Sequence, residues 1–174
     1  HEVLEHIPKN AMINKAYKNM GNLHFADSGM SWGITQPSFS NGAAYGDLDN
    51  DGDLDLVINN INHEAFIYRN NARELRGNHY VGVLLKGDSL NTYAIGSRIA
   101  LYAGSQVMTR EVIPSRGFQS SMDYKQLIGL GKNLAVDSMV ITWADRKVSK
   151  ILRPALDSVF TIAKAKQKLE GPAN

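Results

Sequence analysis

The sequence predicts an all-β chain in two parts. One β-propeller-type blade, with the remnant of a preceding blade before it, is followed by an antiparallel β-sandwich or barrel. Short segments rich in branched and aromatic residues recur between clusters of Gly, Ser, Asn and Asp. The motif Ala16-Tyr17-Lys18-Asn19 returns as Ile67-Tyr68-Arg69-Asn70, with the two tyrosines 51 positions apart. A period near fifty residues is typical of propeller blades.

The first part of the chain carries the predicted blade. A short helix is predicted at residues 2–7, ended by Pro8, and residues 11–18 are predicted as the last strand of a preceding blade. Strands are then expected at 23–26, 42–46, 54–59 and 65–68, and four strands make one blade. We therefore divide this part into a helix and blade remnant at 1–15 and a blade at 16–72. Because a lone blade leaves two unpaired edges, we expect it to pack against further blades of a longer protein.

The second part, residues 77–165, shows short strands at regular spacing, and residues 166–174 form a tail. Strands are expected at 79–86, 98–103, 107–113, 138–143, 148–152 and 159–163, separated by turn signals such as Ala103-Gly104-Ser105. Gly129-Leu130-Gly131 is interpreted as a tight turn between strands, since Asn133 rules out a phosphate loop at Lys132. This spacing is typical of a sandwich or barrel.

Composition excludes several classes of protein. The chain has 174 residues, of which 43% are hydrophobic, so it can build a core, yet its apolar runs are too short to span a bilayer. It contains no cysteine, which excludes disulfides and thiolate metal sites. Residues 1–68 carry a net charge of −6 and residues 69–174 one of +8. The basic residues are scattered without a basic-aromatic stripe, so we expect no nucleic-acid partner.

A run of alternating acids predicts a calcium site. The first, third and fifth positions of the segment Asp47 to Asp55 are aspartates, and Gly52 follows where a loop must turn sharply. Calcium takes six to eight oxygen ligands, which a short loop supplies from alternate positions. We expect the seventh position to offer a backbone carbonyl and the ninth its carboxylate. The candidate ligands are Asp47, Asp49, Asp51, Asp53 and Asp55.

The second half of this segment departs from an EF-hand. Ile58 stands at the twelfth position, where an EF-hand needs Glu, and the residues after Asp55 read as a strand. The alternative is a solvated acidic turn without metal. Calcium is preferred over magnesium, because Mg²⁺ rarely uses an all-protein cage.

These segments resemble two known families. Residues 39–57, from Phe39 through the acidic run to Val57, resemble an FG-GAP/VCBS repeat, the calcium-binding propeller blade of integrin α-subunits. Ala94 to Arg98 and the segments 116–121, 129–131 and 136–143 are similar to the ASPIC/UnbV domain. The resemblance implies an extracellular or cell-envelope location, as in bacterial multi-repeat surface proteins and cartilage acidic proteins. It implies no established reaction.

We therefore expect a non-catalytic, calcium-stabilised adhesion or interaction module whose ligand is a protein or a glycan. The alternative is a carbohydrate-binding module of an envelope protein, which would use aromatics such as Tyr45 and Tyr124. An accessory domain of a glycan-active enzyme is a third and less favoured alternative. The motif around Ser31, Gly-x-Ser-x-Gly, lacks the helix that a nucleophile elbow needs. A polar cluster offers a partner-binding loop, although a turn held by its own hydrogen bonds explains it as well: Arg116, Gln119, Ser120, Ser121 and Asp123.

Overall fold

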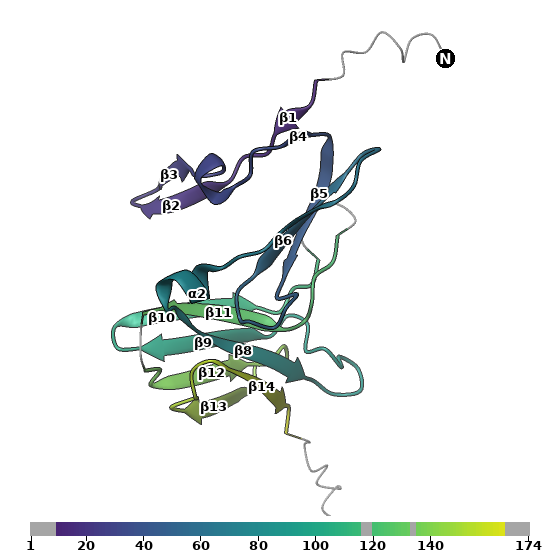
Figure 1. Ribbon diagram of the computed structural model, residues 1–174. Helices are drawn as coiled ribbons and strands as arrows, with labels where there is room; N and C mark the ends of the chain where they lie inside the picture. The colour runs from purple at the N-terminus through teal and green to yellow at the C-terminus, as the bar shows by residue number, and fades with distance from the viewer. Residues whose placement is uncertain (1–9, 116–119, 133–134, 166–174) are drawn as a thin grey trace, which may run out of the picture. The chain divides into compact units, whose positions relative to one another are not determined.

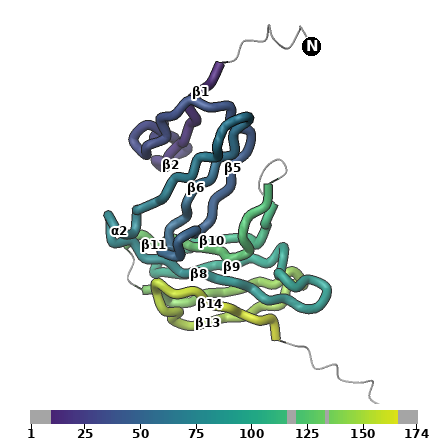
Figure 2. The backbone as a smooth tube through the Cα atoms, turned by 45° about the vertical axis from the view of Figure 1, so that its right-hand side comes forward, coloured from purple at the N-terminus to yellow at the C-terminus, as the bar shows by residue number. Residues whose placement is uncertain are grey.

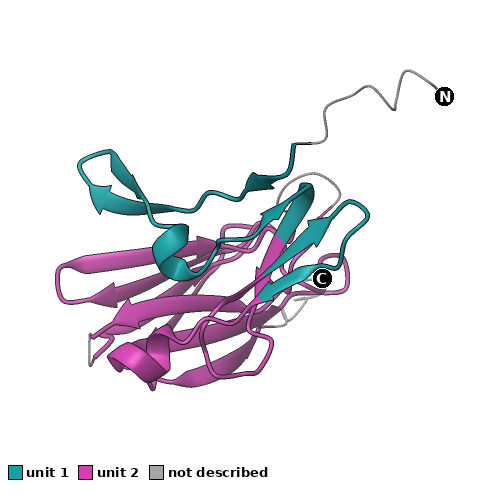
Figure 3. Ribbon diagram, turned by 45° about the horizontal axis from the view of Figure 1, so that its top comes forward, with its two compact units in different colours: residues 1–43, 57–67 teal, residues 44–56, 68–174 magenta. Residues whose placement is uncertain are grey.

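The structure is a computed structural model that describes residues 10–115, 120–132 and 135–165. The chain forms two compact units (Figure 3). The first unit contains residues 1–43 and 57–67, and the second contains residues 44–56 and 68–174. The predicted helix at 2–7 lies outside the described residues. No described helix has the length and apolar character needed to cross a bilayer.

Short strands make up most of the first unit. Strand β1 (Met12–Ile13) pairs with β4 (Pro37–Ser38), and β2 (Tyr17–Gly21) pairs with β3 (His24–Asp27). A single 3₁₀ turn, η1, follows at Met30–Trp32. The strand predicted at 11–18 is therefore wrong as one element, because residues 14–16 separate β1 from β2.

A further sheet has three strands. It has the order β5-β6-β7, with β5 at Ser40–Gly46, β6 at Asp55–Asn60 and β7 at Phe66–Tyr68. The prediction that four strands share one sheet is wrong, because β3 pairs with β2 instead.

The first unit buries little of its apolar surface. Ile34 and Ile58 are its only described residues in the buried hydrophobic set. Its large exposed apolar side chains are Met12, Ile13, Tyr17, Met20, Leu23, Phe25, Met30, Trp32, Ile61 and Ile67. Such a two-stranded hairpin as β2-β3 has marginal stability on its own.

The second unit is a β-sandwich preceded by a short helix, α2 (Ala72–Arg76). One sheet has the order β10-β9-β12-β13 and the other the order β11-β8-β14 (Figure 1). The strands are β8 (His79–Lys86), β9 (Arg98–Ala103), β10 (Gln106–Glu111), β11 (Gln126–Gly131), β12 (Ser138–Thr142), β13 (Val148–Leu152) and β14 (Ser158–Ala163).

Side chains from both sheets meet in one core. Val81 and Val83 of β8 pack with Ile99 of β9 and with Met139 and Ile141 of β12, and all five are fully buried. These residues alternate along their strands, so each strand turns one face inward. The observed architecture is the sandwich rather than the barrel of the sequence prediction.

Most predicted strands of this unit are confirmed. The bounds 79–86, 98–103 and 148–152 are those of β8, β9 and β13, and the other three differ by one or two residues. The turn predicted at Gly129 to Gly131 is wrong, because these residues end strand β11 and only Gly131 turns, with φ +60°. All strand pairs of the sandwich are antiparallel except β8 with β14, which run parallel side by side (Figure 2).

Candidate metal centre

The acidic segment forms a tight loop between β5 and β6, and it belongs to the second unit. Hydrogen bonds from backbone N–H groups of the loop to its own carboxylates hold its shape. Asp49 Oδ1 accepts a hydrogen bond from Asp51 N at 3.2 Å, and Asp51 Oδ1 accepts one from Asp53 N at 2.8 Å. Asp47 Oδ1 accepts one from Gly52 N at 3.3 Å. The bonds of Asp49 and Asp51 are Asx-type bonds, from a side chain to the backbone two residues on, which are a common way to curl a loop, whereas the bond of Asp47 spans five residues.

The turn at Gly52 requires glycine, as the sequence predicts. Gly52 has φ +92°, and a Cβ atom there would lie 2.1 Å from the ring of Tyr80. Asn50, with φ +61°, supplies the other left-handed residue of the loop, and Asn tolerates this conformation better than most residues. The loop therefore lies directly against Tyr80 of strand β8.

Three of the five predicted ligands come together. One carboxylate oxygen each from Asp47, Asp49 and Asp51 lies within 4.8 Å of the other two. Two oxygens on opposite sides of a calcium ion are separated by about 4.6–5.2 Å, twice the usual ligand distance. The three carboxylates therefore have the chemistry and spacing to share one hard cation.

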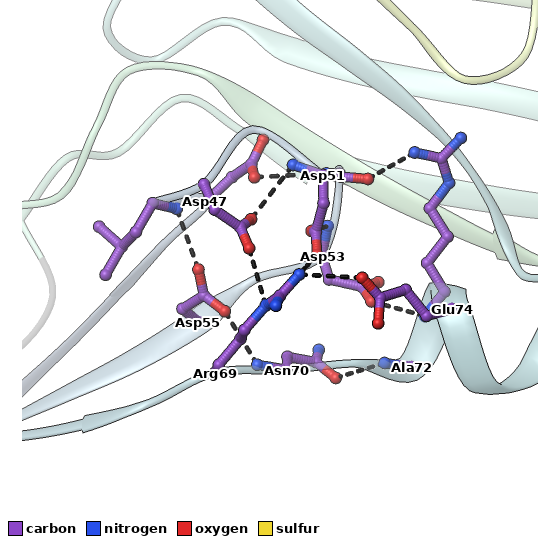
Figure 4. A network of polar contacts seen from close by, with 12 residues as sticks. Asp47, Asp51, Asp53, Asp55, Arg69, Asn70, Ala72 and Glu74 are labelled. Carbon is purple, nitrogen blue, oxygen red and sulfur yellow. Dashed lines mark hydrogen bonds and ion pairs between the residues drawn. The ribbon is translucent and has the colours of Figure 1, made fainter.

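The other two predicted ligands have their carboxylates bound to backbone N–H groups. Asp55, with 2% of its surface exposed, accepts hydrogen bonds from Leu48 N at 3.0 Å and Asn70 N at 2.9 Å (Figure 4). Asp53 accepts one from Arg73 N, at 2.6 Å, in the first turn of α2. Both side chains tie the loop to the segment after β7.

Three cationic residues, none of them predicted as part of the site, contact the loop. Arg69 Nε lies 2.8 Å from Asp49 Oδ2, and the same guanidinium lies among the loop carboxylates in Figure 4. Lys125 Nζ lies 2.9 Å from Asp47 Oδ2. Arg73 Nη1 donates to the Asp51 carbonyl oxygen at 2.6 Å. Arg69 stands in the second copy of the repeated Tyr-Lys/Arg-Asn motif, which is the one sequence signal that could have indicated it.

The electrostatics of the loop follow from burial and these neighbours. Partial burial raises the pKa of Asp53 above its ordinary value, and the nearby Asp51 and Asp55 carboxylates act in the same direction against the Arg73 N–H bond. Asp49 and Glu74 raise the pKa of Arg69. The loop is therefore a region of concentrated negative charge.

A pocket of about 360 Å³ adjoins the loop within the second unit. Asp47 and Lys125 line it, together with Tyr45, Arg110, Asp123 and Gln126. Tyr45 is 43% exposed. The pocket thus combines an aromatic ring with donors and acceptors, which is typical of small-molecule sites.

The predicted partner-binding loop is described only in part. Arg116 and Gln119 lie outside the described residues. Ser121 forms an isolated bridge with Ser115, and Asp123 lines the pocket beside Lys125. Ser120 is half-buried and has an interaction with its surroundings. The structure therefore brings one predicted residue, Asp123, to a cavity.

Two further aromatic residues and Ser31 lie in different surroundings. Trp143 is a core residue with 3% of its surface exposed, and its Nε1 donates to Ser149 Oγ at 2.9 Å. Tyr124 stacks on Tyr93 with ring centroids 4.0 Å apart. Ser31 lies in the 3₁₀ turn and donates to the Ser28 carbonyl at 2.9 Å.

Comparison with known proteins identifies the C-terminal part of the chain. The family model described as ASPIC and UnbV matches residues 87–169. No curated protein matches the chain. The match begins after the acidic loop, so the FG-GAP/VCBS resemblance of residues 39–57 stays a prediction. Residues 87–169, which contain Lys125 and most of the sandwich, therefore form an ASPIC/UnbV domain.

Proposed function

We propose that this chain is a non-catalytic, calcium-stabilised interaction module of the cell surface or extracellular space. The observation that carries the proposal is the convergence of Asp47, Asp49 and Asp51, whose carboxylate oxygens lie within 4.8 Å of one another. A bound calcium ion would neutralise the repulsion between these carboxylates and fix the loop that precedes strand β6. Its binding energy would then add to the free energy of unfolding of the folded chain.

The resemblance of residues 39–57 to a calcium-binding repeat supports the choice of metal and the location. Calcium modules of modest affinity fill where calcium is near millimolar, as it is outside cells. A loop with three converging carboxylates and further backbone oxygens also suits calcium better than magnesium, which keeps several waters and demands octahedral geometry.

Isothermal titration calorimetry of the chelator-treated chain tests the metal site directly. We expect calcium to bind with a 1:1 stoichiometry and with higher affinity than magnesium. If the titration shows no calcium binding at millimolar concentration, the proposal is wrong.

Substitution of one central ligand tests the structural role of the ion. In calcium at about thirty times the Kd, we expect the wild type to gain about 2 kcal/mol over the chelated protein, seen as a rise of several degrees in Tm. Asp49→Ala is expected to melt in calcium near the temperature of the chelated wild type, because it removes one of the three converging carboxylates. Differential scanning calorimetry with and without EDTA measures this difference, and Asp145→Ala is the control on an acid outside the loop.

The exposed apolar side chains of the first unit support the interaction role. Phe25, Trp32 and Leu23 expose 55%, 51% and 95% of their surface. The described part of this unit exposes ten large apolar side chains and has only Ile34 and Ile58 in the buried hydrophobic set. The surface suits packing against further propeller blades of the same polypeptide, as the blade resemblance implies.

A second candidate function, glycan binding, is favoured by the pocket that adjoins the loop. A half-exposed Tyr45 ring offers a surface on which a sugar can stack, and Asp123, Gln126 and Arg110 offer hydrogen bonds around it. Glycan-array screening of the calcium-loaded chain, with Tyr45→Ala as the comparison, separates this candidate from a protein-binding role. Signal that survives Tyr45→Ala would place the sugar elsewhere.

A further inference from the structure

The three converging carboxylates have only one oxygen each that the loop backbone does not use. Asp47 Oδ1, Asp49 Oδ1 and Asp51 Oδ1 accept hydrogen bonds from N–H groups inside the loop. Their Oδ2 atoms accept no hydrogen bond from the loop backbone, so they are the oxygens most open to a cation. This division follows from the bonds between side chain and backbone that curl the loop.

Cationic side chains from outside the loop contact all three of these remaining oxygens. Lys125 Nζ lies 2.9 Å from Asp47 Oδ2 and 3.4 Å from Asn50 Oδ1. Arg69 reaches the other two, with Nε 2.8 Å from Asp49 Oδ2 and Nη2 3.5 Å from Asp51 Oδ2. Two positive side chains thus take the oxygens that a metal ion would need.

We propose that Arg69 and Lys125 are built-in counter-ions of the acidic loop, which hold it folded without metal and which calcium must displace to bind. This inference rests on the proposed calcium site. A divalent ion a few ångströms from a guanidinium or an ammonium group would be repelled by it, so each cation lowers the affinity for calcium. The two residues are therefore affinity-setting residues of the site.

The Arg69 and Lys125 side chains each have an alternative position available when calcium binds. Arg69 already contacts Glu74 Oε1 through Nη2 at 2.9 Å, and its side chain is 54% exposed. Lys125 lines the 360 Å³ pocket beside the loop. Displacement therefore strands neither charge in an apolar environment, which keeps its cost moderate.

Calcium titration of charge variants tests the inference. We expect Arg69→Gln to bind calcium about threefold to tenfold more tightly than the wild type, the factor that corresponds to one partly exposed ion pair. Lys125→Gln should tighten binding at least as much, because its pair with Asp47 is largely buried, with side chains 16% and 2% exposed. Arg69→Lys keeps the charge and should stay near the wild-type Kd. Lys164→Gln is the matched control, because Lys164 pairs with two acids outside the loop, Asp88 at 2.8 Å and Asp145 at 3.0 Å, and its Kd should not change.

Melting temperatures give a second readout that a purely structural role would not produce. In EDTA, Arg69→Gln and Lys125→Gln should melt below the wild type, whereas in saturating calcium the deficit should close. If the wild type binds calcium and both Gln variants bind it with unchanged or weaker affinity, the counter-ion inference is overturned while the proposed function stands. If no variant and no wild type binds calcium, the proposed function itself fails.

Discussion

At the residue scale, Gly52 is the position where the loop has least freedom to change. Its φ of +92° disfavours any side chain, and a Cβ would overlap the ring of Tyr80. That ring cannot shift freely, because Tyr80 is buried and the Arg73 guanidinium lies 5.1 Å from its centre. We expect Gly52→Ala to lower the free energy of unfolding by about 2 kcal/mol or more and to weaken calcium binding.

Chemical denaturation and calorimetry of the same samples measure the two effects. Gly129→Ala is the matched control, since Gly129 lies in strand β11 with no atom within 4 Å of a Cβ placed there. Equal stabilities of the two variants would show that the close approach of Gly52 to Tyr80 is not needed.

The sequence could predict the aspartates of the site but not its cations. Alternating carboxylates and a glycine are local features, so their spacing predicts the convergence of Asp47, Asp49 and Asp51. Lys125 lies 78 positions from its partner Asp47. Only the pairing of strands across the sandwich brings it there, and no local pattern encodes such a contact. Asp55 shows the reverse problem, because burial and two backbone hydrogen bonds give it a structural role that its spacing does not reveal.

At the element scale, one aspartate joins the first and last strands of the sandwich. Asp157 precedes β14, and its carboxylate accepts hydrogen bonds from His79 Nδ1 at 2.7 Å and from Tyr80 N at 3.3 Å. Partial burial acts to raise the pKa of Asp157, but the bonds from His79 and Tyr80 and the charge of Arg73 together lower it below its ordinary value. The ionised form is therefore the one that the fold stabilises.

This lowered pKa predicts an acid-dependent loss of stability. A group with a depressed folded pKa contributes stability above its unfolded pKa near 3.8, and the contribution is lost as the pH falls through the folded value. We expect Asp157→Asn to cost about 1 kcal/mol or more at pH 7 and the difference from the wild type to shrink towards pH 3. Urea denaturation at pH 7, 5 and 3 measures it, with the exposed Asp123→Asn as control. A difference that grows in acid would contradict the prediction.

Strands were predictable where apolar residues run through or alternate along a segment, and unpredictable where two glycines stand close together in it. Strand β8 has a nearly continuous apolar run, and β9 has Ile99 and Leu101 at alternate positions, so pattern and structure agree. Strand β11 contains Gly129 and Gly131, which read as turn residues, yet its pairing with β8 makes it a strand. Tertiary pairing overrides local preference in this way more often in sheets than in helices. The prediction of a four-stranded blade is wrong for the same reason. Which strands share a sheet depends on long-range pairing, and the local sequence does not encode it.

At the scale of the whole molecule, the two units differ in how much they bury. The second unit has a continuous core that includes Val81, Ile99, Leu101, Ile128 and Met139, whereas the described part of the first unit buries Ile34 and Ile58. Stability is therefore unequal along the chain, and regions with few buried apolar contacts open at lower free energy.

Limited proteolysis should reveal this difference. We expect a broad-specificity protease to cut first within residues 10–43 and to leave a resistant fragment that contains residues 79–163, because local opening exposes the backbone of the first unit more often. Mass spectrometry of a time course identifies the cuts. Early cleavage inside β8, β9 or β12 would contradict the expectation. Repeating the digestion in calcium and in EDTA separates protection by the metal from protection by the core.

The parallel pairing of β8 with β14 has a consequence for how the chain acquires its fold. The first strand of the sandwich finds one of its two neighbours at Ser158–Ala163, nearly eighty residues later in the chain. Closing such a long separation is slow, because its entropy is lost before any contact forms. During synthesis, an edge of β8 therefore stays unpaired until Ser158–Ala163 has left the ribosome, and chaperones that shield strand edges have their longest opportunity to act there.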